Sequence, residues 1–84
     1  MNDRSLSQRL FRRYLQDQGL PVTQQRMAIA EVVSSTGKHL SVEDIEAELR
    51  KGGNRIGKAT IYRTLDLLVR SRIVVEHDFG EGFK

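Results

Sequence analysis

The sequence predicts a mainly α-helical domain that ends in a small β-hairpin, and three observations lead to this prediction. Apolar residues recur at helical spacing in four successive segments, each followed by a glycine-containing break or a polar turn. A β-branched run with the composition of a strand, Ile73 to Asp78, follows the last segment. Gly80 and Gly82 then suit a hairpin turn. The expected fold is therefore four helices followed by strand, turn and strand, with the second strand cut short after Lys84.

Length and composition restrict the functions that this fold can serve. The chain has 84 residues, of which 38% are hydrophobic and 30% charged, as in one small soluble domain. A domain of this size buries only about 60 to 65 per cent of its unfolded surface, which leaves little room for a deep catalytic cavity. No apolar run approaches the roughly 20 residues of a membrane span, and no secretory signal is evident, so we expect a cytoplasmic protein. The absence of cysteine excludes disulfides and thiolate metal sites within this chain.

The first two helices are predicted from apolar stripes and from the residues that bound them. The stripe of the first helix contains Leu6, Leu10, Phe11, Tyr14 and Leu15. Gly19 and Pro21 end that helix. The second helix is predicted from about Gln24 to Ser35, with Thr23 as its N-cap.

The third helix begins with a recognisable cap. Ser41 precedes it, and Asp44 three residues later completes a capping-box-like pair, in which each side chain can bond the other residue's amide. Its buried stripe is predicted to contain Val42, Ile45 and Leu49. The glycine pair at 52–53 ends it.

The fourth helix, predicted from about Lys58 to Arg70, has two sides of different chemistry. Its apolar side contains Ile61, Leu65 and Leu68. Its other side presents Lys58, Ala59, Tyr62 and Arg63. Two helices joined by a short glycine-containing loop and followed by a hairpin form a winged helix-turn-helix, whose second helix enters the major groove of DNA. The sequence therefore predicts one winged-helix domain, 1–84, that binds double-stranded DNA.

Seven residues are candidate DNA contacts. The candidates are Arg26, Arg55, Lys58, Ala59, Thr60, Tyr62 and Arg63. Tyr62 can contact a thymine methyl group or a phosphate, and Arg63 a guanine edge or a phosphate. Lys58 and Thr60 are expected at the DNA backbone, and the arginines at the head of the second helix and in the turn are expected to anchor phosphates.

Four motifs then occur in succession along the chain. They are Pro21-Val-Thr-Gln-Gln-Arg26, His39-Leu-Ser-Val-Glu-Asp44-Ile, Gly57-Lys-Ala-Thr-Ile-Tyr-Arg63 and Ile73-Val-Val-Glu-His-Asp-Phe79. From about Gly19 onward the chain resembles the ferric uptake regulator (Fur) family, and the Gly-x-Ala-Thr-[Val/Ile]-Tyr-Arg block is the most specific part of the resemblance. The resemblance implies the DNA-binding domain of a metal-responsive repressor, which dimerises through a C-terminal metal-binding domain that this chain lacks.

The resemblance also implies roles for single residues. Tyr62 and Arg63 match the family's major-groove tyrosine and the arginine that follows it. His39 matches the ligand that the DNA-binding domain lends to a divalent iron, zinc or manganese ion in the intact protein, and we expect no cofactor in this chain alone. In one departure, Pro21 stands where many members carry a lysine or arginine for the minor groove, so that contact is lost or passes to Arg26.

The same residues also permit readings without DNA or metal. Tyr62 can cover the rim of the core and Thr60 can cap its helix, while the arginines can be solvated surface charges. His39 can be an ordinary exposed histidine, and His77 is read as structural.

The alternatives to a DNA-binding domain of the Fur family are a protein-binding module, a regulator of another family and an enzyme. A winged-helix module that binds protein is expected to have an acidic or apolar recognition face, whereas Lys58, Arg63 and Arg70 are opposed here only by Asp66. A winged-helix regulator outside the Fur family is a further possibility. The net charge of +3 does not by itself indicate a nucleic acid. No nucleophilic cysteine, glycine-rich phosphate loop or paired histidine motif is present, so no enzyme is predicted.

Overall fold

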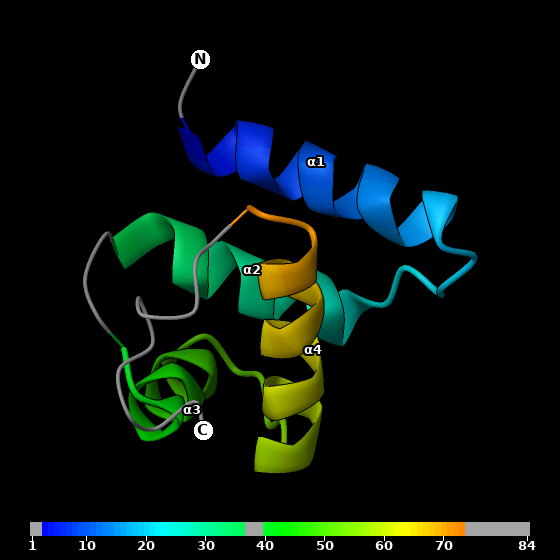
Figure 1. The fold of residues 1–84 in the computed structure, drawn as a ribbon. Helices are drawn as coiled ribbons and strands as arrows, with labels where there is room; N and C mark the ends of the chain where they lie inside the picture. The colour runs from blue at the N-terminus through cyan, green and yellow to red at the C-terminus, as the bar shows by residue number, and fades with distance from the viewer. Residues whose placement is uncertain (1–2, 37–39, 74–84) are drawn as a thin grey trace.

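The computed structural model describes residues 3–36 and 40–73, and these residues form the four predicted helices. The helices are α1 (Asp3–Asp17), α2 (Gln24–Thr36), α3 (Val42–Lys51) and α4 (Lys58–Arg70). Helix α2 contacts each of the other three, and α3 also contacts α4 (Figure 1). The strand and turn predicted at 73–82 lie outside the described residues, except for Ile73, which lies in a bend. The hairpin therefore stays a prediction.

The core lies between α2, α3 and α4, with one side of α1 added to it. Its buried apolar members are Phe11, Leu15, Ile29, Ala30, Val42, Ile45, Leu49, Ile56, Ile61, Leu65 and Leu68. The predicted stripes of α3 and α4 are thereby confirmed. Thr64 is the one buried polar residue among those described, and its hydroxyl donates to the Thr60 carbonyl at 2.8 Å. This bond satisfies the hydroxyl inside the core.

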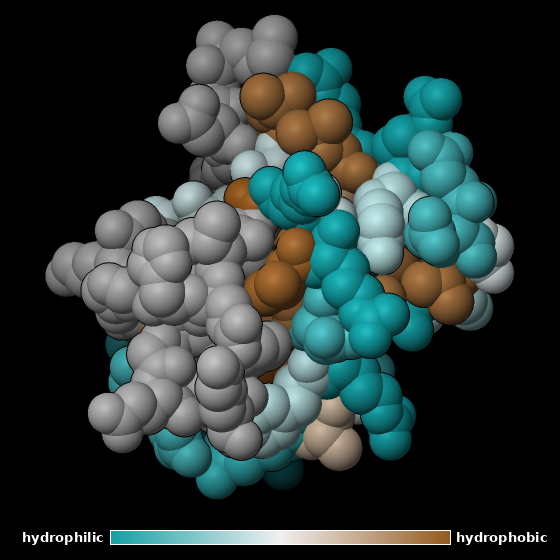
Figure 2. Space-filling view, in the orientation of Figure 1, coloured by the Kyte–Doolittle hydropathy of each residue, from teal (hydrophilic) through white to brown (hydrophobic). Residues whose placement is uncertain are grey.

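The predicted stripe of α1 is only partly buried. Phe11 and Leu15 are fully buried, but Leu6 and Leu10 remain 43% and 49% exposed. Helix α1 packs mainly against α2. Helix α2 covers only part of the apolar stripe of α1. Figure 2 shows apolar surface exposed on the part of the molecule where α1 lies. The apolar stripe predicted for α1 is therefore wider than the part of α1 that is buried.

Side-chain caps fix the starts of α2 and α3. The Thr23 hydroxyl accepts from the Arg26 amide at 3.1 Å, which confirms the predicted N-cap of α2. At α3 the Ser41 hydroxyl accepts from the Asp44 amide at 3.0 Å, and the Asp44 carboxylate accepts from the Ser41 amide at 3.1 Å. The capping box is confirmed, and it fixes the residue at which α3 begins.

Glycine ends α3 and lets the chain turn toward α4. Gly53 has φ +86°, a left-handed conformation that costs little only for glycine. Its amide donates to the Arg50 carbonyl at 3.0 Å, and the Asn54 amide donates to the Leu49 carbonyl at 2.8 Å. These bonds satisfy the last carbonyls of α3. Within 3–36 and 40–73 no helix has the length and apolar character required to cross a membrane.

Candidate nucleic-acid interface

Helix α4 turns one side toward the core and the other toward solvent. Ile61, Leu65 and Leu68 are at most 1% exposed. The solvent side of the first two turns, here called the outer face of α4, consists of Lys58, Ala59, Tyr62 and Arg63, all of them exposed. Tyr62 is 38% exposed although it is large and aromatic. The structure therefore places these four predicted site residues on one accessible surface.

The N-terminus of α4 has no side-chain cap. Gly57 occupies the N-cap position with extended backbone (φ −74°, ψ 160°), and no side chain accepts a hydrogen bond from the first amides. The alternative reading of Thr60 as a cap was wrong, because Gly57 holds that position and Thr60 is half-buried in the helix. Free amides and the helix dipole give this end of α4 partial positive charge, which favours an anion such as phosphate.

An ion pair joins the start of α4 to the start of α3. The Lys58 ammonium nitrogen lies 3.4 Å from Oε2 of Glu43, and both side chains are at least half exposed. A hydrogen bond from its own backbone amide and the nearby Lys58 ammonium hold the pKa of Glu43 below its ordinary value. The sequence pattern did not reveal this pair, because the two residues belong to different helices and meet only when the helices pack.

The remaining charges of α4 are distributed unevenly along the helix. Arg70 in the last turn pairs with Asp66 at 2.9 Å. In the part of the chain that the structure describes, the Arg63 guanidinium forms no ion pair. The uncompensated positive charge of the helix therefore lies near its N-terminal half, beside Tyr62.

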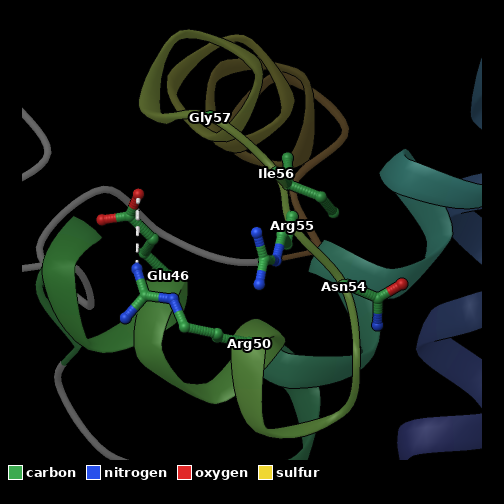
Figure 3. A pocket seen from close by; sticks show the side chains of 6 residues that line it. All are labelled: Glu46, Arg50, Asn54, Arg55, Ile56 and Gly57. Carbon is green, nitrogen blue, oxygen red and sulfur yellow. Dashed lines mark ion pairs between the residues drawn. The ribbon is translucent and has the colours of Figure 1, made fainter.

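A hollow of about 500 Å³ lies at the turn between α3 and α4 (Figure 3). It is lined by Glu46, Arg50, Asn54, Arg55, Ile56 and Gly57. Glu46 and Arg50 form a long ion pair of 3.9 Å within α3. Figure 3 shows Arg55 extending from the turn into the hollow, toward that pair. Arg55 thus adds exposed positive charge next to the start of α4.

The Arg26 side chain bonds to the loop before α2. Its guanidinium donates to the Pro21 carbonyl at 2.7 Å, which ties the loop before α2 to the first turn of that helix. In Figure 1 the first turn of α4 lies at the bottom of the view, and the first turn of α2 lies away from it. Four of the five donors of a guanidinium remain after one such bond, so a phosphate contact by Arg26 stays a prediction.

The predicted metal ligand cannot be placed. His39 and His77 both lie outside the described residues. Within 3–36 and 40–73 no group of three or more histidine, aspartate or glutamate side chains is arranged to hold a metal ion. Metal binding through His39 therefore stays a prediction for the intact protein.

Comparisons with known proteins agree with the motifs that make up this surface. The sequence profile of the ferric uptake regulator family matches residues 17–84, which include α2, α3 and α4. The chain is 36% identical over 69 residues to the ferric uptake regulation protein of Pseudomonas aeruginosa, a match that covers 81% of this chain and 52% of that protein. It is 41% identical over 69 residues to the protein of the same name in Vibrio parahaemolyticus, covering 81% of this chain and 46% of that protein.

A third relative has the same name and comes from a third bacterium. The ferric uptake regulation protein of Bacillus subtilis is 35% identical over 73 residues, which are 86% of this chain and 49% of that protein. The chain thus spans about half the length of the curated relatives it matches. No solved structure matches it significantly. Because the family profile covers most of the chain and includes every residue of the outer face of α4, the chain belongs to the ferric uptake regulator family.

Proposed function

We propose that this chain binds double-stranded DNA sequence-specifically, as the DNA-binding domain of a metal-responsive transcriptional repressor. The observation that carries the proposal is the outer face of α4, where an exposed tyrosine and arginine stand on an aliphatic core. The major groove, about 12 Å wide, admits a helix and displays the base edges that such side chains recognise. Family membership supports the same function, since the relatives are named ferric uptake regulation proteins.

The outer face of α4 divides into base contacts and backbone contacts. Arg63 is suited to the O6 and N7 acceptors of guanine, and Tyr62 to a thymine methyl group. Lys58, Arg55 and the uncapped amides at the start of α4 are suited to phosphates. The phosphate contacts orient the helix, and the base contacts supply sequence preference.

In the intact protein we propose that a divalent metal controls this binding. Two DNA-binding domains in a dimer must reach half-sites about one helical turn apart. A metal bound by the C-terminal domain, with His39 as the ligand from this chain, would fix the angle between the two domains. A single domain then binds weakly and depends strongly on salt. The alternative function, a module that binds protein, would require an acidic or apolar recognition face. The outer face of α4 carries Lys58 and Arg63 instead.

Titration of a labelled duplex with the 84-residue chain at about 50 and about 200 mM salt tests the proposal. If two to four phosphates are neutralised, we expect affinity to fall about tenfold to 150-fold between the two salt concentrations, because bound counterions are released. A scrambled duplex is expected to bind more weakly than one selected by the chain from a random pool. Equal affinity at both salt concentrations, or no preference between the duplexes, would contradict the proposal.

A further inference from the structure

We propose that Glu43 competes with DNA for Lys58, so that the carboxylate of α3 sets how tightly the outer face of α4 binds any duplex. This inference rests on the proposed DNA binding, and it assigns Glu43 the role of weakening that binding. Its basis is the 3.4 Å contact between the Lys58 ammonium and the Glu43 carboxylate. In the free protein this carboxylate occupies the position that a phosphate oxygen would take beside the ammonium group.

The Lys58–Glu43 pair differs in its geometry from the neighbouring ion pairs. Lys51–Glu48 and Arg70–Asp66 each lie within one helix, three or four residues apart. The Lys58–Glu43 pair instead crosses from the first turn of α4 to the first turn of α3. Glu43 is therefore paired with Lys58, a positively charged residue of the outer face of α4.

The pair is not needed to hold the two helices together. Its side chains are 50% and 64% exposed, and exposed ion pairs contribute little to stability. The start of α3 is already fixed by its capping box, and α4 is held by three fully buried apolar side chains. Removal of the carboxylate should therefore leave the fold intact.

The chemistry of the two partners makes the exchange reversible. A lysine ammonium is a compact point charge with three donors, and it can donate to a carboxylate oxygen or to a phosphate oxygen. DNA must break the pair and must also approach the negative charge of Glu43. Because phosphate contacts carry no sequence information, this cost applies to every duplex. Base contacts by Tyr62 and Arg63 are unaffected.

The test compares duplex affinity of the wild-type chain with that of Glu43→Gln, which keeps the side chain's size and removes its charge. We expect Glu43→Gln to bind about two- to fivefold more tightly, the range that one exposed ion pair represents, to selected and scrambled duplexes alike. Glu48→Gln is the matched control, because it makes the same charge change on the same helix while its partner is Lys51 of α3 itself. Its effect should be smaller, since exposed charges away from the contact are screened. Circular dichroism checks that both variants fold.

A second pair of variants isolates the role of Lys58. In a Lys58→Met background, Glu43→Gln should tighten binding no more than Glu48→Gln does. Two results would overturn the inference. One is that Glu43→Gln binds duplex no more tightly than Glu48→Gln when Lys58 is present. The other is that Glu43→Gln increases affinity just as much in the Lys58→Met background. In either case salt-dependent binding by the wild-type chain would leave the proposed function standing. No duplex binding by the wild-type chain would overturn both.

Discussion

Replacement of Arg63 by alanine is expected to weaken binding to a selected duplex by about 1 to 3 kcal/mol, which is roughly 5- to 150-fold. The reason is geometric. Arg63 is exposed on the outer face of α4, next to Tyr62, and forms no ion pair with other described residues. Its fork of donors is free to bind one guanine through two acceptors. Fluorescence anisotropy with the selected duplex and with single-base substitutions of it measures the loss.

The matched control is Arg70→Ala on the same helix. Arg70 lies two turns further along the same side and already pairs with Asp66. We expect little change in affinity, because residues near the N-terminus of a recognition helix contact the bases. If Arg63→Ala weakened binding to every duplex equally, Arg63 would be a phosphate contact. If Arg70→Ala cost as much as Arg63→Ala, the proposed orientation of α4 in the groove would be wrong.

Replacement of Leu65 by alanine is expected to destabilise the fold by about 2 to 5 kcal/mol. Leu65 is fully buried on the side of α4 opposite the outer face, in the core shared with α2 and α3. The change removes apolar contacts and leaves a cavity. That loss is a large part of the roughly 5 to 15 kcal/mol by which small domains are stable. Urea unfolding followed by circular dichroism gives the change in free energy of unfolding.

Leu10→Ala provides the control with the same chemistry at an exposed position. Leu10 is 49% exposed on α1, so we expect its loss to change stability by no more than about 0.5 kcal/mol. A cost for Leu65→Ala as small as that for Leu10→Ala would show that the aliphatic side of α4 does not support the outer face. A large cost for Leu10→Ala would show that another surface covers this part of α1.

Local signals were sufficient to predict α3 and α4. The Ser41–Asp44 capping box and the glycines at 52–53 act within one turn of the chain, so they can be recognised without tertiary structure. The two sides of α4 followed from helical periodicity alone, because the aliphatic and polar residues separate cleanly on its surface. For the same reason the exposure of Tyr62 and Arg63 was predictable.

Features that depend on how helices pack were not predictable from the sequence. The pattern of α1 identifies an apolar side, but the width that α2 covers decides whether Leu6 and Leu10 are buried. The Lys58–Glu43 pair needs the packing of α3 against α4, and no spacing rule connects its members. The bond between the Arg26 guanidinium and the Pro21 carbonyl depends likewise on how the loop before α2 folds.

The most direct test of the account is the map of backbone amides that change chemical shift when a selected duplex is added to ¹⁵N-labelled chain. We expect the largest changes at Lys58 to Arg63 and at Arg55, and little change around Leu6 and Leu10. These expectations follow from the outer face of α4 and the charge beside its start. Shifts concentrated on α1, with the amides of α4 unchanged, would show that DNA binds another surface and would contradict the account.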